Sequence, residues 1–127
     1  EEEFAVVRKH TLWGAEILAH SPRFAMARNI CLYHHERWCG GGYPEGLAGE
    51  AIPLEGRIVA VCDVYDALRS KRSYKPSFSH ERALEILLEG DGRVGPEHFD
   101  PRLLEILRRR GGELASIFGR FPERETG

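Results

Sequence analysis

Two adjacent histidines, His34 and His35, end an apolar helical pattern and stand directly before a glycine-rich stretch. A histidine pair adds no apolar area to a helix, whereas imidazole nitrogens are common transition-metal ligands. His10 lies on the inward stripe of an earlier helical pattern, and Asp63 lies in a later one. Helical bundles build metal sites from imidazoles and carboxylates that converge from separate helices. These four residues could therefore form one metal site.

Each of these residues also has a structural explanation. His10 could be a core histidine that is hydrogen-bonded to a carbonyl. His34 and His35 could simply mark the end of a helix, and Asp63 could be a helix cap or an ion-pair partner. Composition and spacing leave both explanations open, although the structural one needs four independent exceptions.

The stretch 39–56 holds six of the fourteen glycines and two prolines, and it has no helical or strand periodicity. A loop of this length is usually either functional or disordered. Its apolar residues favour an ordered loop whose backbone at Gly42 could lie against a ligand, with Tyr43 stacking on it. The alternative is a flexible connector. The stretch is not a P-loop, because no Gly-Lys-Ser/Thr follows the glycines.

A basic patch, which includes Arg72 and Lys75, follows the helical pattern that contains Asp63. Such a run is most often a solvated helix end. It could also clamp a phosphate, with arginine binding in bidentate fashion and lysine acting as a point charge.

The periodicity of apolar residues predicts an all-α protein. Helices are expected over 1–20, 22–38, 54–70, 80–89 and 101–110, with one further short turn over 114–118. Ser79 and Asp100 are expected N-caps, and Gly111-Gly112 is expected to end the fifth helix. Gly14 is costly inside a helix, which predicts that another element approaches it closely.

The composition is that of one soluble domain, with 127 residues, 42% hydrophobic and 30% charged residues. A net charge of −2 provides no basic footprint for a nucleic acid polymer. No signal peptide and no apolar run of about 18 residues is present, so no membrane contact is expected. Cys31, Cys39 and Cys62 lack CxxC spacing, which argues against a disulfide framework or zinc ribbon and favours the reducing cytoplasm.

An ordered series of motifs covers residues 4–107. It comprises His10-Thr11-x-x-Gly14, His34-His35-Glu36-Arg37-Trp38-x-Gly40-x-Gly42-Tyr43-Pro44-x-Gly46-Leu47, Ile52-Pro53, Arg57-Ile58-Val59-Ala60-Val61-x-Asp63-Val64-Tyr65-Asp66-Ala67-Leu68, Arg72-x-Tyr74-Lys75 and Phe99-Asp100-Pro101. In this series the chain resembles the HD-GYP family, a branch of the HD-domain metal-dependent phosphohydrolases.

The resemblance implies an HD-domain-like helical bundle of about five helices with a long glycine-rich loop. It implies hydrolysis of cyclic di-GMP, a bacterial second messenger, at two or three iron or manganese ions. No catalytic group is implied beyond the metal-bound hydroxide. The implied metal ligands are His10, His34, His35 and Asp63. The implied substrate-binding residues are Gly42, Tyr43, Arg72 and Lys75.

Two departures from the family pattern modify these expectations. No His-Asp dipeptide occurs in the sequence, although the family's name-giving pair lies upstream of the His10 position. Because the chain also begins inside a helical pattern, we expect a partial HD-GYP domain over 1–127, ordered over about 4–121, with partial or no metal occupancy. Cys39 stands where the family usually has aspartate, which puts loop geometry or substrate positioning in question.

Three functions follow from these observations. The first is the C-terminal part of a cyclic di-GMP phosphodiesterase, inactive as this chain alone. The second is a non-catalytic module that docks a diguanylate-cyclase-type domain through Gly42-Tyr43-Pro44. The third is a helical domain without a ligand. An incomplete helical core would also favour a homodimer.

Overall fold

The computed structural model describes residues 9–18, 24–70 and 76–120. Regular structure in these ranges is helical throughout, which confirms the predicted all-α class. The described residues form five α-helices: α2 (His10–Leu18), α3 (Ala25–Tyr33), α4 (Leu54–Arg69), α5 (His80–Glu89) and α6 (Pro101–Arg120). Two 3₁₀ turns, Gly49–Ala51 and Pro96–His98, interrupt the loops before α4 and α6.

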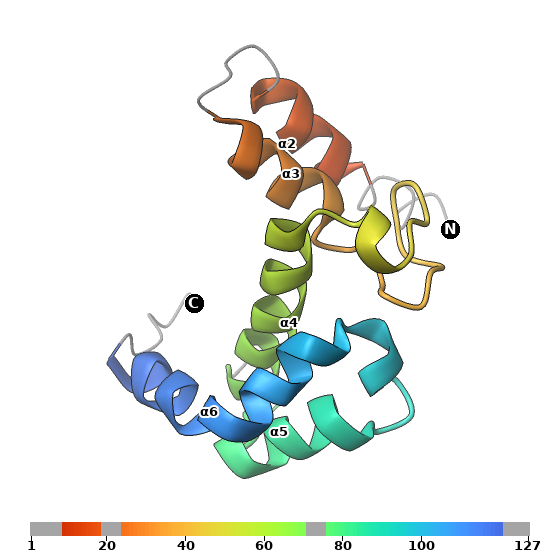
Figure 1. Cartoon of the computed structure of the whole chain (residues 1–127). Coiled ribbons are helices and arrows are strands. Elements are labelled where there is room, and N and C mark those ends of the chain that lie inside the picture. Colours follow the sequence, from red (N-terminus) through yellow and green to blue (C-terminus); the bar gives the residue numbers. More distant parts are fainter. Residues whose placement is uncertain (1–8, 19–23, 71–75, 121–127) are drawn as a thin grey trace.

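The helices form two groups joined by α4. Figure 1 shows α2 and α3 paired side by side at the N-terminal end of α4, with the loop that precedes α4 beside them. Helices α5 and α6 lie at the other end of α4. The histidine-containing segment therefore lies at the junction between the α2–α3 pair and the start of α4.

The main hydrophobic core lies where α4, α5 and α6 meet. Ala83, Ile86 and Leu87 on α5 are completely buried, and Val61, Tyr65 and Leu68 on α4 pack against them. Burying a large aliphatic side chain contributes about 1.5–3 kcal/mol. This core therefore lies toward the C-terminal end of α4, whereas His34 and His35 share a cavity with Ala60 and Val64 in the middle of the helix.

Two predicted helices have the expected boundaries. Helix α4 follows Pro53 and ends at Arg69, close to the predicted range 54–70. Helix α5 covers the predicted range 80–89, and the Ser79 hydroxyl accepts a hydrogen bond from the Arg82 backbone N–H at 3.1 Å. Gly90 follows with φ of +93°, a conformation that favours glycine.

One other boundary was predicted wrongly and a second in part. Helix α3 ends at Tyr33, not at residue 38, so His34 is its C-cap residue and Glu36 and Trp38 lie in the following loop. The predicted break at Gly111-Gly112 is present as a kink at Arg110, whose φ of −125° and ψ of 19° are not helical. Helical structure then resumes and runs to Arg120, further than the short turn predicted over 114–118. The expected helix starts at 1 and 22 lie outside the described residues.

Glycines account for two close helix contacts. A Cβ added at Gly14 would lie 3.1 Å from Cys31 Cβ, so α2 and α3 approach each other as predicted. A Cβ at Gly111 would lie 3.0 Å from Leu84 Cδ1, so α6 approaches α5 at this residue. Gly111 therefore permits close packing directly after the kink at Arg110.

The inward stripe of α4 was only partly predicted. Val61, Tyr65 and Leu68 are buried as expected, but Ile58 is 41% exposed and Cys62 is also exposed. Both line an apolar groove of about 260 Å³ that α4 shares with α6. The described chain therefore leaves part of the α4 stripe uncovered.

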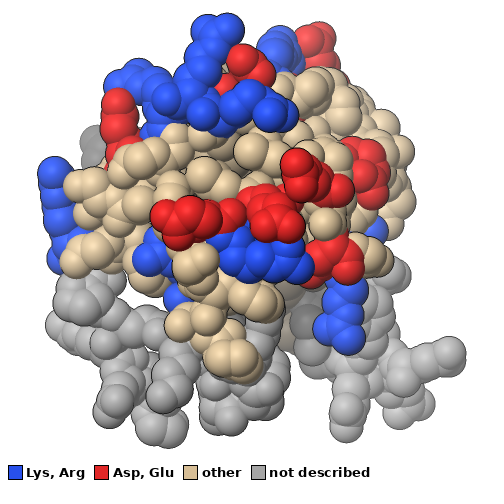
Figure 2. Space-filling view, turned by 90° about the horizontal axis from the view of Figure 1, so that it is seen from below, with Lys and Arg blue, Asp and Glu red and all other residues tan. Residues whose placement is uncertain are grey.

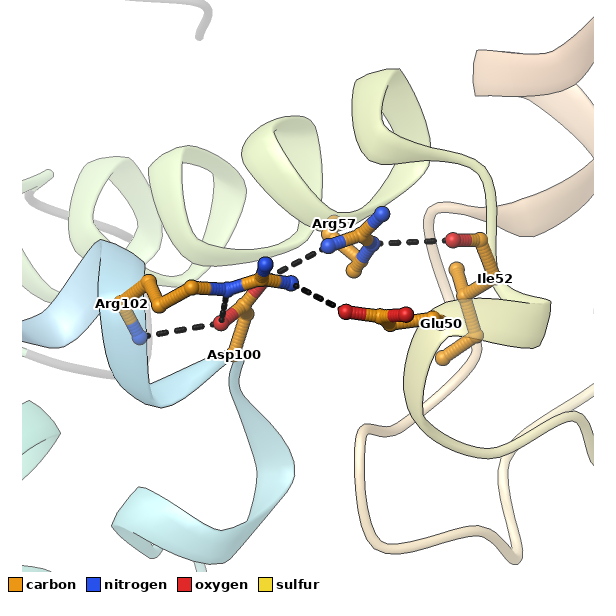
Figure 3. A network of polar contacts seen from close by, with 5 residues as sticks. All are labelled: Glu50, Ile52, Arg57, Asp100 and Arg102. Atoms are coloured by element: carbon orange, nitrogen blue, oxygen red, sulfur yellow. Dashed lines mark hydrogen bonds and ion pairs between the residues drawn. The ribbon is translucent and has the colours of Figure 1, made fainter.

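A polar network joins the loop before α4 to the start of α6. The Asp100 carboxylate is buried and accepts from Arg57 Nη1 at 2.6 Å and from the Arg102 backbone N–H at 2.9 Å. Arg57 Nε also donates to the Ile52 carbonyl at 2.9 Å, and Arg102 contacts Glu50 at 3.3 Å (Figure 3). Asp100 thus caps α6, as predicted, and also ties α6 to α4.

The surface carries charges of both signs. Figure 2 shows acidic and basic side chains next to one another on the face seen from below. Many of these pairs belong to single helices, as with Arg109 and Glu105 on α6 or Arg82 and Glu85 on α5. Exposed pairs of this kind contribute little to stability. None of the described helices is long and apolar enough to cross a membrane.

Candidate metal centre

Three of the predicted metal ligands lie together. His10 is the first residue of α2, and His34 and His35 follow directly after α3. One ring nitrogen from each lies within 4.8 Å of the others, so the three imidazoles could hold one ion. The ring centroids of His34 and His35 are 4.1 Å apart, and that of His10 is 5.5 Å and 4.9 Å from them.

His34 is oriented by the helix that it ends. Its Nδ1 lies 2.8 Å from the Ile30 carbonyl oxygen. Because a carbonyl oxygen only accepts hydrogen bonds, Nδ1 must carry the proton, which leaves Nε2 as a lone-pair donor. A histidine that donates one ring N–H to a carbonyl has the usual arrangement of a metal ligand in proteins.

His35 is uncharged at neutral pH. Burial, together with the neighbouring His34 and His10, lowers its pKa from 6.5 to about 4, and the Asp63 carboxylate opposes that shift. Only a neutral imidazole has a free lone pair for a metal. His35 is therefore already in the protonation state that metal binding needs.

Tyr43 brings the glycine-rich loop onto the histidines. Its ring stacks on His35, with centroids 4.9 Å apart and an interplanar angle of 19°. The Tyr43 backbone N–H donates to the His35 carbonyl at 3.2 Å. A Cβ at Gly42 would lie 2.5 Å from the His35 carbonyl oxygen, so only glycine permits this approach.

Glu36 holds the same loop in place, a role that the sequence did not reveal. Its side chain is buried, and its two carboxylate oxygens accept three backbone hydrogen bonds. Glu45 N and Leu47 N donate at 2.7 Å each, and Gly46 N donates at 3.0 Å. The carboxylate therefore closes residues 36–47 into one unit that includes Tyr43 and adjoins His35.

A cavity of about 350 Å³ opens beside the histidines. Its size and its mixture of aromatic, glycine and charged residues are those of a small-molecule site. It is lined by His34, His35, Glu36, Arg37, Gly41, Gly42, Tyr43, Ala60, Val64, Arg93, Val94, His98 and Phe99.

A family model described as the HD domain matches residues 1–103. The chain belongs to the HD domain family. The resemblance to HD-domain proteins that the motifs predicted is thereby confirmed.

Curated relatives of this HD domain are named as cyclic dinucleotide phosphodiesterases. The chain is 50% identical to a cyclic di-GMP phosphodiesterase of Vibrio cholerae, over 97% of this chain and 26% of that protein. It is 43% identical to the 3'3'-cGAMP-specific phosphodiesterase 2 of the same organism, over 96% and 23%. It is 47% identical to the cyclic di-GMP phosphodiesterase response regulator RpfG of Xanthomonas campestris, over 95% and 32%. The chain thus spans about a quarter to a third of these relatives.

The other predicted site residues of this HD domain are placed differently. Asp63, on α4, lies outside the set of three imidazoles, although its charge reaches His35. Arg72 and Lys75 lie outside the described residues. Cys39 is exposed, its thiol contacts the Gly40 carbonyl at 3.4 Å, and it does not line the cavity.

The donor set of the HD domain suits a transition metal. Imidazole nitrogens suit transition metals better than calcium or magnesium, which prefer oxygen ligands. His34 has an oriented free nitrogen, and His35 is neutral. The donor set therefore supports a transition-metal site.

The low pKa of His35 predicts how the metal-free HD domain responds to acid. Between pH 6.5 and about 4 the unfolded chain binds a proton at His35 that the folded chain does not bind. The free energy of unfolding should therefore fall as the pH falls through this range. Urea unfolding at pH 7.5 and 5 should show this fall, and His35→Gln should reduce it. An equal fall in the variant would contradict the assignment.

Proposed function

We propose that this chain forms the metal- and nucleotide-binding part of a bacterial cyclic di-GMP phosphodiesterase that acts in the cytoplasm. The observation that carries the proposal is the stacking of Tyr43 on His35, within a cluster of three imidazoles that borders a cavity. The relatives named as cyclic dinucleotide phosphodiesterases support it. On this proposal residues 1–127 are part of an HD-GYP domain.

Each residue of the site would have a distinct task. His10, His34 and His35 would hold the metal. Asp63 would be a further ligand, and the electrostatic effect of its carboxylate on His35 supports this role. Iron or manganese would supply Lewis-acid stabilisation of the charge on the phosphodiester. Gly42 and Tyr43 would form the wall of the nucleotide site.

The phosphate of the substrate would be bound by basic residues. Arg72 and Lys75 would bind it, as the resemblance to the HD-GYP family implies. Arginine suits a bidentate contact to two phosphate oxygens, and lysine supplies a point charge. Both residues lie outside the described ranges, so their part in the proposal depends on the motif Arg72-x-Tyr74-Lys75 alone.

The test is a hydrolysis assay on the complete gene product with Mn²⁺ or Fe²⁺ and cyclic di-GMP. We expect metal-dependent turnover, and a loss of at least about 100-fold in a His34→Ala/His35→Ala variant, because two ligands are removed. Glu85→Gln, an exposed change on α5, should leave turnover unchanged. The 127-residue chain alone, which has no His-Asp pair, should show none.

Three results of this assay would contradict the proposal or change a part of it. Absence of turnover by the complete gene product with either metal would refute the phosphodiesterase proposal. Turnover by the 127-residue chain alone would refute its proposed inactivity. Hydrolysis of 3'3'-cGAMP in preference to cyclic di-GMP would change the proposed substrate, since relatives with either specificity are similar to this chain.

The second candidate is a docking module for a diguanylate-cyclase-type domain. The observation in its favour is that Glu45 and Gly46, which follow Gly42-Tyr43-Pro44 in the same loop, are exposed and do not line the cavity. Tyr43→Ala should then weaken partner binding in a pull-down. Unchanged binding would argue against docking. The phosphodiesterase is favoured, because the Tyr43 ring lies on His35.

A further inference from the structure

The cavity beside the histidines has a basic part that the proposed function does not use. Arg37, Arg93 and His98 line it together with His34, His35 and Tyr43. A second cavity of about 490 Å³ is lined by the same Arg37, Arg93 and His98, and also by Glu89 and Glu97. The two cavities therefore share one cationic border.

The two arginines of this border have no ion pair within the part of the chain that the structure describes. No hydrogen bond or ion pair of the Arg37 or Arg93 guanidinium to another residue is found within 9–18, 24–70 and 76–120. Several other arginines in these ranges do form ion pairs, as Arg57 does with Asp100 and Arg110 with Glu113. The positive charge of Arg93 acts electrostatically on the Asp91 carboxylate, and that of Arg37 acts on the His98 ring. Neither guanidinium forms an ion pair with the group on which it acts. Both guanidiniums are exposed and available to a ligand.

The backbone holds this cationic border in place. Trp38 N donates to the His98 carbonyl at 2.9 Å, which joins the segment after the histidines to the loop 90–99. The Asp91 carboxylate accepts from Arg93 N at 2.9 Å and from Val94 N at 2.8 Å, which closes a turn at Arg93. The two arginines therefore extend from a backbone that is already ordered.

The positive charge of this border suits a phosphate ligand. Although the chain has a net charge of −2, Arg37 and Arg93 bring two guanidiniums, without an ion pair among the described residues, to the lining of one cavity. A guanidinium binds phosphate with two parallel hydrogen bonds, more specifically than an ammonium does. A cyclic dinucleotide carries two phosphates, and the proposed metal centre accounts for only the one that is cleaved.

We propose that Arg37 and Arg93, with His98 beside them, form a subsite for the second phosphate of the cyclic dinucleotide. The proposal rests on the proposed function for the nature of the ligand. The subsite is distinct from Arg72 and Lys75, and it joins the loop 90–99 to the nucleotide site. The combined cavities are within the usual range of about 300–1,000 Å³ for a small-molecule site.

The test measures binding to the metal-free 127-residue chain by calorimetry, so that hydrolysis and metal affinity do not enter. The probes are cyclic di-GMP and, separately, inorganic pyrophosphate. Arg37→Gln and Arg93→Gln should each weaken binding of both probes by about tenfold, because each removes a charge-assisted hydrogen bond. They should also reduce the dependence of affinity on salt concentration. Arg109→Gln, an exposed arginine paired with Glu105 on α6, is the matched control and should change nothing.

Three results would overturn the subsite. The first is that neither probe binds to the wild-type chain. The second is that a double Arg37→Gln/Arg93→Gln variant binds both probes as the wild type does. The third is that the arginine variants bind cyclic di-GMP more weakly but keep the pyrophosphate affinity and the salt dependence of the wild type. This result would mean that the guanidiniums contact a base of the dinucleotide and not a phosphate. If the complete gene product does not hydrolyse cyclic di-GMP but binding to the chain still depends on the two arginines, the proposed function is contradicted and the phosphate subsite is not.

Discussion

Replacing Asp100 by alanine is expected to lower the free energy of unfolding by about 3–5 kcal/mol. The Asp100 side chain is 1% exposed and bonds to Arg57 at 2.6 Å, so its removal leaves a nearly buried guanidinium without its partner (Figure 3). It also removes the acceptor for the Arg102 backbone N–H, a cap worth about 1 kcal/mol. Urea unfolding at pH 7 measures the loss.

A matched control separates this network from ordinary surface charge. Glu113→Ala removes an equally charged group from an exposed pair with Arg110, and it should cost less than about 1 kcal/mol. Burial opposes the charged form of Asp100, but the bonds from Arg102 and Arg57 lower its pKa overall. The stabilisation by Asp100 should therefore persist above its usual pKa and disappear as the pH falls through the folded-state pKa. Equal losses in the two variants would contradict the network's importance.

Replacing Glu36 by alanine is expected to release the loop that carries Tyr43. Three backbone N–H groups lose a charged acceptor, and each such bond contributes about 1.5–3 kcal/mol. Because Tyr43 stacks on His35, metal affinity should also fall, by about 10–100-fold. Hydrogen exchange at Glu45, Gly46 and Leu47 and titration with Mn²⁺ measure the two effects.

The isosteric variant Glu36→Gln tests whether charge or shape matters. Its amide N–H₂ would face a backbone N–H that needs an acceptor, so at least one of the three bonds must break. Exchange at the loop amides should increase, though less than in Glu36→Ala. Glu45→Gln changes an exposed neighbour and is the control. Unchanged exchange in both Glu36 variants would show that the carboxylate does not hold the loop.

Local signals in the sequence predicted much of the fold. Ser79, Pro53 and Gly90 act on the residues next to them, and α4 and α5 have the predicted boundaries. The end of α3 depends instead on distant partners. After Tyr33 the chain is held by the Glu36 carboxylate and by the bond from Trp38 N to the His98 carbonyl, some 60 residues away. A helical pattern cannot contain that information.

Two glycines show the same limit of prediction from a local sequence pattern. Gly14 and Gly111 both permit close helix packing, on Cys31 and Leu84 respectively. Gly14 lies within a strong apolar pattern, so packing was the natural prediction. Gly111 precedes a second glycine, and the pair predicts a helix break, which the structure shows as a kink at Arg110 and not as the end of α6.

The candidate site was partly accessible from sequence. Helical spacing placed His10 and His34 on inward faces. The structure brings both rings next to His35, although His10 is exposed, contrary to that prediction. Glu36 was missed because its partners are backbone amides nine to eleven residues later, which no side-chain pattern reveals. Arg93 was missed because only the folded loop 90–99 brings it to the cavity.

The most direct test of the metal centre is a titration of the metal-free chain with Mn²⁺ or Fe²⁺. We predict that the wild-type chain binds either ion weakly, and that a His34→Ala/His35→Ala variant binds it at least about tenfold more weakly still. Equal affinity of the wild-type chain and the variant for both ions would contradict the assignment of His10, His34 and His35 as a metal centre.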